Sequence, residues 1–357
     1  MKGQELPVLV EDAEAVVAAI EGIADGLRGS SVLVTGATGL LGSQIVRALL
    51  CANDLLGLGC RILASGRSAE KLAEVFDDPG AEELGFCVAD VADSLEVEGP
   101  VDYIFHCASP TSSRFFVSRP VDTINAAFCG TRNVLELARA KEAKSVVYLS
   151  SLEVYGEFFG RDAAVSEAEF GSIDPMSVRS SYSEGKRLCE CLCAAYASQY
   201  QVPVKVARLS QTFGAGVEYD DGRVFAEFAR CALEERPITL HTLGRTTRTY
   251  CYTADAVVAL LYILLCGENG EAYNVSNENT AISIREMAEL VSRTLSATGV
   301  PVVVDVPDDL EVYGYNPEMV IKLDCSKLRE LGWEPKTNLE EMFTRMARGF
   351  SGQQSGL

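Results

Sequence analysis

The sequence predicts an α/β fold in which a doubly wound parallel sheet carries a smaller, discontinuous C-terminal cap. Between residues 31 and 210, short β-branched runs alternate with longer segments of helical periodicity. A glycine-rich turn, residues 36–42, directly follows the first of these runs. After residue 210 the alternation becomes looser. Because strands that alternate with helices form a parallel sheet covered on both faces, we expect one buried sheet with the cap beside it.

The sheet half begins after a helical extension. Residues 6–28 have apolar side chains at helical spacing, which predicts an amphipathic helix ahead of the first strand. The strands expected in this half are residues 31–35, 61–65, 86–88, 101–106, 145–149 and 204–208. The helices expected between them are residues 40–50, 70–76, 121–141 and 182–200.

The second half contains fewer strands and no internal repeat. We expect helices at residues 223–235, 255–266, 283–294 and 339–350, and strands at residues 238–241 and 272–275. We therefore expect an N-terminal helical extension (1–30), a domain built on the parallel sheet (31–210), a region that is mainly cap with some segments returning to the sheet (211–350), and a tail (351–357).

Composition limits the possible partners. With 48% hydrophobic residues, the 357-residue chain can bury a sizeable core, yet its longest apolar runs, such as residues 256–266, are too short to span a membrane. The net charge of −20 argues against binding to nucleic acid, which requires a basic face. Residues 1–28 are acidic and lack the basic start of a signal peptide, so we expect a cytoplasmic protein with reduced, mostly buried cysteines.

The run Cys189, Cys191 and Cys193 is the one cysteine pattern that suggests a metal. Helical spacing places Cys189 and Cys193 on one face and Cys191 elsewhere, and the two histidines, His106 and His241, are distant in sequence. These spacings differ from those of zinc sites, so we expect packed thiols and no metal.

The turn at residues 36–42 predicts a dinucleotide site. Its glycines allow a tight turn and a close approach of the backbone to a pyrophosphate, which then lies at the N-terminus of the following helix. The required strand and helix flank the turn on both sides. The cofactor-binding residues expected here are Gly36, Thr38, Gly39, Leu40, Leu41 and Gly42.

The end of the second strand bears on the choice between NAD and NADP. An acid at this point binds the ribose diol of NAD, whereas a basic residue favours the 2′-phosphate of NADP. The chain has Ser65 and Arg67 here, and no acid. Arg67 therefore favours NADP, because a guanidinium matches phosphate geometry, although it is also compatible with an ordinary surface position. Asp90 and Val91, after the third strand, are expected beside the adenine.

A phenol and an ammonium lie four residues apart at Tyr182 and Lys186. On a helix they share one face, so we expect Lys186 to lower the pKa of Tyr182 from its ordinary value of about 10. Ser151 and Glu153 follow the fifth strand, at the sheet edge where ligands bind in such folds. Together these residues predict a proton relay facing the cofactor.

Two other polar residues have a simpler interpretation. His106 closes the fourth strand, where we expect it to be packed and hydrogen-bonded. Asn125 lies inside the long helix at residues 121–141, where a polar side chain more often bonds locally than takes part in chemistry.

With these residues in place, the chain resembles the extended short-chain dehydrogenases/reductases, in the nucleotide-sugar epimerase/dehydratase group, from about residue 31 to residue 350. The shared motifs are the glycine spacing at 36, 39 and 42, Ser151, Tyr182 with Lys186, residues 221–224, residues 248–252 followed by Asp255, and residues 331–333. Within the group it is most similar to the UDP-glucuronate decarboxylases, through residues 108–110, 152–155, 179–187 and 221–224.

The resemblance implies a Rossmann-type domain, a substrate-binding cap, and internal oxidation of a nucleotide sugar. In this scheme Ser151 and Tyr182 activate the sugar C4 hydroxyl, Lys186 holds the nicotinamide ribose, and Glu153 assists at the sugar ring. It also implies NAD as the cofactor and a homodimer formed through the helices at 121–141 and 182–200. The remaining contacts implied are Ala108, Ser109 and Asn125 with the cofactor, and Pro110, Thr111, Gln211, Arg223 and Arg248 with the substrate.

The chain departs from the family pattern at several positions. Leu152 stands where a 4,6-dehydratase has an aspartate acid and where the decarboxylases have a serine, and leucine cannot transfer a proton. Gln211 replaces an asparagine of the decarboxylases, and Ala215-Gly216 replaces a Pro-Arg pair. Three functions remain open: a decarboxylase-type lyase, an NADP-dependent reductase or epimerase of another activated sugar or polyol, and a non-catalytic dinucleotide sensor.

Overall fold

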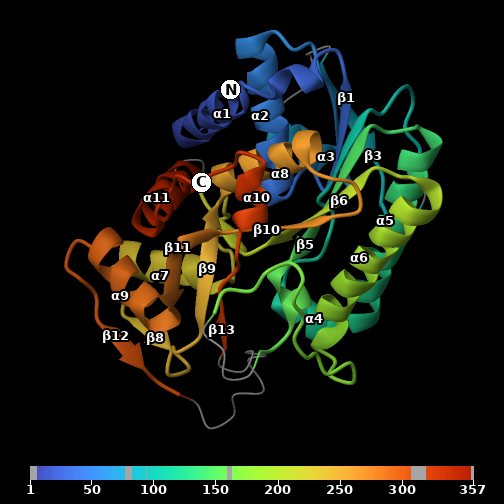
Figure 1. Cartoon of the computed structure of the whole chain (residues 1–357). Helices are drawn as coiled ribbons and strands as arrows, with labels where there is room; N and C mark the ends of the chain where they lie inside the picture. Colours follow the sequence, from blue (N-terminus) through green and yellow to red (C-terminus); the bar gives the residue numbers. More distant parts are fainter. Residues whose placement is uncertain (1–5, 77–82, 94, 159–162, 307–318, 355–357) are drawn as a thin grey trace.

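A seven-stranded sheet runs through the centre of the molecule (Figure 1). The computed structural model describes residues 6–76, 83–93, 95–158, 163–306 and 319–354. All neighbouring strands of this sheet are parallel, in the order β10-β6-β5-β4-β1-β2-β3. The strands are β1 (Ser31–Thr35), β2 (Arg61–Gly66), β3 (Leu84–Val88), β4 (Tyr103–His106), β5 (Ser145–Ser151), β6 (Val204–Leu209) and β10 (Ala272–Val275). The strand order reverses between β1 and β4, which confirms the expected doubly wound sheet and marks where ligands bind in such sheets.

Helices cover both faces of the sheet, as strands buried on both faces require. Helices α5 (Pro120–Ala140) and α6 (Ser180–Tyr200) lie side by side on one face (Figure 1). Helices α2 (Leu40–Leu56) and α8 (Thr253–Cys266) pack against each other and contribute to the core on the other face. A smaller core beneath α5 and α6 includes Cys189 and Cys193, whereas Cys191 is exposed.

The N-terminal helix is shorter than the sequence suggested. In place of one helix over residues 6–28, α1 (Pro7–Ile20) is followed by a turn and the 3₁₀ helix η1 (Ala24–Leu27). The turn contains Gly22, and glycine is a poor helix former. Residues 1–5 of the predicted extension and residues 355–357 of the predicted tail lie outside the described residues.

A mixed sheet forms the centre of the cap. Strand β9 (Thr247–Tyr252) pairs with β7 (Gln211–Phe213), β11 (Asn277–Ser283) and β13 (Val320–Ile321). Strands β8 (Ile238–Leu240) and β12 (Val302–Val304) form a separate pair. The helices of this half besides α8 are α7 (Val224–Leu233), α9 (Ile284–Leu295), α10 (Ser326–Glu330) and α11 (Leu339–Gln354). The sequence did not predict β7, β9, β11, β12 or β13.

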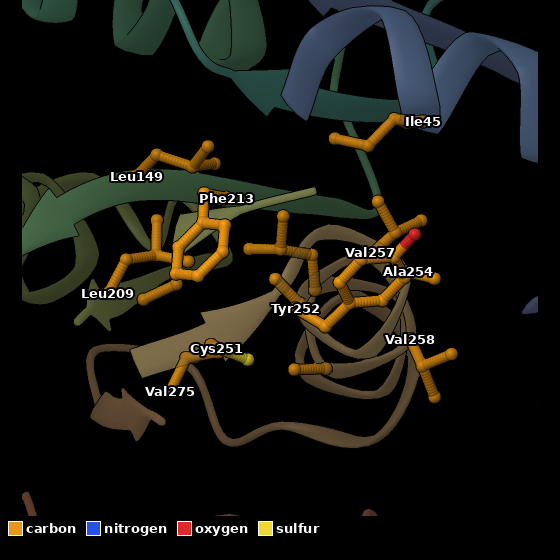
Figure 2. Close-up of a cluster of buried hydrophobic side chains, with 14 of the residues drawn as sticks. Ile45, Leu149, Leu209, Phe213, Cys251, Tyr252, Ala254, Val257, Val258 and Val275 are labelled. Atoms are coloured by element: carbon orange, nitrogen blue, oxygen red, sulfur yellow. The ribbon is translucent and has the colours of Figure 1, made fainter. Parts of the chain in front are cut away.

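An apolar seam joins the cap to the parallel sheet (Figure 2). Leu209 ends β6, and two residues later β7 begins the cap sheet, so the cap starts at the carboxyl edge of β6. Phe213 of β7 is fully buried and stacks on Phe225, with ring centroids 4.5 Å apart. Cys251 and Tyr252 at the end of β9 complete the buried cluster. The seam thus holds the cap beside the edge at which the predicted site residues lie.

Within the described parts of the chain, no helix has the length and apolar character that crossing a bilayer requires.

Candidate active site

The glycine turn between β1 and α2 leaves no space for side chains. Gly36 has φ +64°, and a Cβ there would lie 2.8 Å from backbone atoms of Ala108. A Cβ on Gly42 would lie 2.3 Å from the carbonyl oxygen of Gly36. Gly39 immediately precedes the first turn of α2. A backbone this close-packed at a helix N-terminus fits the pyrophosphate of a dinucleotide.

The other residues predicted around the turn have varied environments. Thr38, Leu40 and Leu41 are half-buried, and both leucines pack against the main core. The second strand ends beside the turn, because the backbone N–H of Ala37 donates to the carbonyl of Ser65 at 2.9 Å. The Ser65 hydroxyl is buried without a hydrogen-bond partner among the described residues.

The loop after β3 carries the residues predicted to contact adenine. Asp90 is exposed, and its carboxylate accepts the backbone N–H of Ala92 at 2.9 Å. The carbonyl of Val91 accepts from the side chain of Asn133 at 2.9 Å, and the Val91 side chain lies against Gly130. Asn133 of α5 therefore positions this loop, a contact that the sequence did not indicate.

Residues 108–111 follow β4, next to the glycine turn. Ala108 contacts Gly36, and Ser109 and Pro110 are half-buried, whereas Thr111 is exposed. Asn125 lies on the exposed side of α5. His106 is buried, and its ring nitrogens contact the hydroxyls of Thr35 and Thr131 at 2.8 and 3.3 Å. Burial lowers the pKa of His106 to about 3, so it is a neutral packing residue, as expected.

The phenol of Tyr182 lies at the carboxyl edge of β5, on the first turn of α6. Its ring stacks on Phe116 at 4.2 Å between centroids. Phe116 belongs to α4 (Ser113–Ser118), a short helix that the sequence did not predict. Burial, followed by the charge of Glu153, raises the pKa of Tyr182. Hydrogen bonding with Ser151 and the charge of Arg179 act in the lowering direction.

The expectation that Lys186 lowers the pKa of Tyr182 is therefore wrong for this structure. The Lys186 ammonium donates to the carbonyl of Leu149 at 2.7 Å and lies 5.8 Å from the Tyr182 ring. It also lies 4.8 Å from the ring of Tyr148 on β5. Burial lowers the pKa of Lys186 to about 8. The helix thus brings Lys186 near Tyr182, but the ammonium points at a backbone carbonyl.

Glu153 is held by an ion pair that the sequence did not indicate. Both terminal nitrogens of Arg179 donate to its carboxylate, at 3.0 and 2.9 Å. The Ser183 hydroxyl adds a third hydrogen bond at 3.0 Å. The Arg179 guanidinium also lies over the ring of Phe116, at 5.1 Å. Such bidentate, charge-assisted bonds fix the orientation of the carboxylate.

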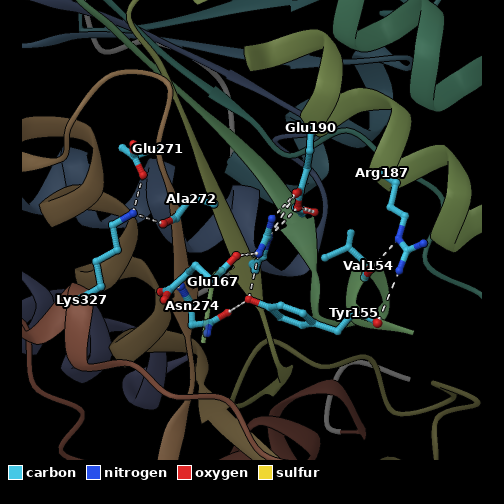
Figure 3. A network of polar contacts seen from close by, with 11 residues as sticks. Val154, Tyr155, Glu167, Arg187, Glu190, Glu271, Ala272, Asn274 and Lys327 are labelled. Carbon is cyan, nitrogen blue, oxygen red and sulfur yellow. Dashed lines mark hydrogen bonds and ion pairs between the residues drawn. The ribbon is translucent and has the colours of Figure 1, made fainter. Parts of the chain in front are cut away.

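The turn that carries Glu153 is anchored from two sides through the next two residues, Val154 and Tyr155 (Figure 3). Ser151 ends β5, and its hydroxyl accepts the backbone N–H of Glu153 at 3.2 Å, which starts the 3₁₀ helix η2 (Leu152–Tyr155). Arg187 of α6 donates to the carbonyl of Val154 at 2.7 Å. The Tyr155 hydroxyl donates to Asn274 of β10 at 2.6 Å. Helix α6 therefore carries both the Tyr182/Lys186 face and an anchor for the neighbouring turn.

A buried ion pair between Arg208 and Glu190 also contacts η2, through the Tyr155 hydroxyl. Arg208 of β6 donates to the Glu190 carboxylate, with the shortest contact at 2.7 Å, and to the Tyr155 hydroxyl at 3.0 Å. Glu190 also accepts from Ser150 at 2.5 Å. These hydrogen bonds link β5, β6 and α6, the three elements that carry or adjoin Ser151, Tyr182 and Lys186.

The two arginines among the predicted substrate contacts in the cap are engaged with protein groups. Arg223 is paired with Asp221, with a shortest contact of 2.6 Å. Arg248 on β9 donates to the sulfur of Met319 at 3.3 Å, and its Nε is buried without a partner among the described residues. Gln211 is half-buried at the start of β7. The contacts bring Ser151, Glu153, Tyr182 and Lys186 together, whereas each cap arginine has its own local partner.

The described residues contain no group of three or more His, Cys, Asp or Glu side chains able to hold a metal. The side chains of Ser151 and Tyr182 offer proton transfer at the phenol, assisted by the Ser151 hydroxyl, next to a dinucleotide cradle. An anion, Glu153, is fixed beside it.

Known proteins are similar to this chain over most of its length. UDP-glucuronic acid decarboxylase 6 of Arabidopsis thaliana is 33% identical over 321 residues, covering 89% of this chain and 88% of the plant protein. UDP-glucuronic acid decarboxylase 1 of Xenopus tropicalis is 31% identical over 313 residues, covering 87% of this chain and 69% of the frog protein.

Solved structures share the fold at lower identity. The UDP-glucose 4-epimerase of Thermotoga maritima, solved with UDP-glucose, has a TM-score of 0.75 and 22% identity, covering 91% of this chain and 99% of that one. The UDP-glucuronic acid 4-epimerase of Bacillus cereus, in complex with NAD, has a TM-score of 0.74 and 20% identity, covering 92% and 98%. Residues 32–276 match the family model described as the NAD dependent epimerase/dehydratase family. The chain belongs to this family of nucleotide-sugar enzymes.

Proposed function

We propose that the chain is a decarboxylase of the UDP-glucuronate type, which oxidises C4 of a nucleotide-activated uronic acid with a bound nicotinamide dinucleotide. The observation that carries the proposal is the grouping of Ser151, Tyr182 and Lys186 at the sheet edge beside the glycine turn. The named relatives, 31–33% identical, support the choice of substrate.

In the proposed reaction, Tyr182 receives the proton of the sugar C4 hydroxyl while the Ser151 hydroxyl donates to the same oxygen. When bound, the oxidised nicotinamide accepts a hydride from C4 and later returns it. The 4-keto uronic acid formed in this way is a β-keto acid, so its carboxylate leaves readily as CO₂. The enolate left behind takes a proton from water at C5, which gives the 4-keto pentose. Tyr182 then returns its proton to the C4 oxygen.

The other residues of the site position the reactants. We propose that Lys186 holds the nicotinamide ribose, from its place one turn after Tyr182. Because Glu153 is bound by Arg179 and Ser183, we assign it the role of a hydrogen-bond acceptor for the sugar hydroxyls rather than that of a proton donor. Gln211, Arg223 and Arg248 remain proposed contacts of the nucleotide and diphosphate.

The test is to supply UDP-glucuronate to the purified protein and to measure CO₂ and a UDP-pentose by mass spectrometry. We expect both products in equal amounts, with no net consumption of cofactor. Tyr182→Phe should lower the rate by at least about 100-fold while dinucleotide binding is kept, because only the proton acceptor is removed. A wild-type protein that yields neither product would refute the assignment.

A reductase or epimerase of another activated sugar is the second candidate. Arg67, Leu152 and Gln211 favour it, since each departs from the decarboxylase pattern. Stoichiometric oxidation of NADPH by a keto-sugar would identify the reductase. A non-catalytic dinucleotide sensor is disfavoured, because the Ser151, Tyr182 and Lys186 side chains are all present and close together.

We further propose a homodimer formed through α5 and α6. The apolar side chains of Val121 and Ile124 on α5 and Leu188 on α6 are exposed in the single chain, as are Val117 of α4 and Val178 just before α6. A second copy that packs the same two helices against them would bury these side chains by two-fold symmetry. Sedimentation velocity should give twice the mass of one chain.

A further inference from the structure

The end of β2 differs from the site that an NAD-binding sheet of this kind requires. The ribose diol of NAD is bound by a carboxylate at this point. Here Ser65 stands at the end of the strand, and its carbonyl accepts the N–H of Ala37 in the glycine turn at 2.9 Å. A side chain at the end of β2 is therefore close enough to the glycine turn to reach the adenine ribose, and the residue at this position is a serine, not an aspartate or glutamate.

The first acid after β2 is Glu70, and its carboxylate is already engaged. The Ser68 hydroxyl donates to Glu70 at 2.7 Å, at the start of α3 (Ala69–Phe76). The same hydroxyl accepts the backbone N–H of Lys71 at 3.1 Å. The Glu70 carboxylate is thus held at the N-terminus of α3 by Ser68, three residues after Arg67.

Two groups at this point can hold a phosphate. The Ser65 hydroxyl is fully buried and has no hydrogen-bond partner among the described residues, which is costly for a polar group. Arg67, directly after the strand, is exposed, and no described residue forms a hydrogen bond or ion pair with its guanidinium. Most other arginines of the site, Arg179, Arg187, Arg208 and Arg223, are bound to protein acceptors.

We propose that Arg67 and Ser65 form a binding site for the 2′-phosphate of NADP, so that the chain prefers NADP over NAD. The inference rests on the dinucleotide cradle of the proposed function and names the form of the cofactor. A guanidinium binds a phosphate through two parallel hydrogen bonds, and a hydroxyl donates a third. The preference is notable because the similar epimerase of Bacillus cereus was solved with NAD.

The experiment measures binding by the full chain, without a substrate. Cofactor carried through purification is removed and identified by mass spectrometry, and the affinities for NADP⁺ and NAD⁺ are then measured by calorimetry. Arg67→Met keeps the apolar stem and removes the donors. Arg61→Met is the matched control, because Arg61 is also an exposed arginine but lies at the opposite end of β2.

We expect wild type and Arg61→Met to bind NADP⁺ at least about tenfold more tightly than NAD⁺. Arg67→Met should lose about that factor for NADP⁺ and change NAD⁺ affinity less than about twofold. The inference is overturned if NAD⁺ binds as tightly as NADP⁺, if Arg67→Met leaves the ratio unchanged, or if neither dinucleotide binds.

The same design separates this inference from the proposed reaction. A protein that prefers NADP⁺ but forms no product from UDP-glucuronate contradicts only the decarboxylase assignment. A protein that decarboxylates UDP-glucuronate but prefers NAD⁺ contradicts only the role of Arg67.

Discussion

Replacing Arg179 by methionine should expose the role of the Glu153 ion pair. Methionine keeps an unbranched apolar stem for the contact with Phe116 and removes both donors to the Glu153 carboxylate. Glu153 then retains the hydrogen bond from Ser183 but has no compensating charge. The substitution therefore leaves a carboxylate alone beside Tyr182.

The size of the effect on stability follows from burial. Leaving one member of a fully buried ion pair without its partner costs about 3–5 kcal/mol. The two side chains are 19% and 17% exposed, so water reaches them and reduces the penalty. We expect Arg179→Met to lower the free energy of unfolding by about 2–3 kcal/mol, measured by urea denaturation. The double variant with Glu153→Gln should be less destabilised, because the isolated charge is removed.

Arg179→Met should also change the pH dependence of the reaction rate in a predictable direction. The charge of Glu153 raises the pKa of Tyr182, and that of Arg179 lowers it. Tyr182 must lose its proton to act as a base, so Arg179→Met should move the acidic limb of the pH–rate profile to higher pH. Each unit of that shift lowers the rate about tenfold at a pH below the limb. Glu153→Gln should move the limb to lower pH.

The double variant decides between electrostatic and purely structural roles. If Arg179 acts by compensating Glu153, the acidic limb of the Arg179→Met/Glu153→Gln protein returns toward its wild-type position. A double variant whose pH profile matches that of Arg179→Met alone would refute this reasoning. So would an Arg179→Met protein whose profile and stability equal those of wild type.

Two further substitutions test the cradle and the buried lysine. Gly42→Ala should weaken dinucleotide binding at least about tenfold by calorimetry, since its Cβ would meet the Gly36 carbonyl, whereas Gly22→Ala, with nothing within 4 Å, should not. Lys186→Met should be about 1–3 kcal/mol more stable than wild type at pH 7, because burial lowers the pKa of Lys186 from 10.5 to about 8. The free energy of unfolding of wild type should rise as the pH increases from 8 to 10.5. In this range Lys186 is protonated in the unfolded chain and neutral in the folded one. Lys205→Met is the control, because burial also lowers the pKa of Lys205 to about 8, but this residue lies at the opposite end of the sheet. The Lys205→Met protein should therefore show the same change in stability and keep dinucleotide binding. Denaturation at pH 7 and pH 9.5 that shows no difference for either variant would contradict the argument.

The parallel sheet was predictable because its signals are local. Buried strands such as β1 have an apolar centre, here Val32, Leu33 and Val34, and the strands of this sheet are separated along the chain by helices or turns. The cap strands are short, two to seven residues, and their partners are distant in sequence. A three-residue strand such as β7 has too few residues for an alternation to be visible.

The candidate site was predictable in its members and not in their contacts. Spacing placed Tyr182 and Lys186 on one helix face, and strand order placed Ser151 at the same edge. The ion pair between Glu153 and Arg179 joins residues 26 positions apart, and no local pattern encodes it. The stacking of Phe116 on Tyr182 depends on α4, a helix of six residues that has no periodicity to detect.

The wrong prediction for Tyr182 concerns which groups around the phenol change its pKa. Four-residue spacing fixes where the Cα of Lys186 lies, but the long side chain can direct its ammonium elsewhere. The Lys186 ammonium donates to the Leu149 carbonyl, and burial, not this lysine, is the largest influence on the pKa of Tyr182. Arg179 lies outside the Tyr-Lys motif, yet it is the cation that lowers the pKa of Tyr182, while it also binds the anion that raises it. Besides burial and the hydrogen bond with Ser151, the Glu153–Arg179 pair therefore contributes to the pKa of Tyr182, and substitutions there should shift the pH profile even though the Tyr-Lys motif is intact.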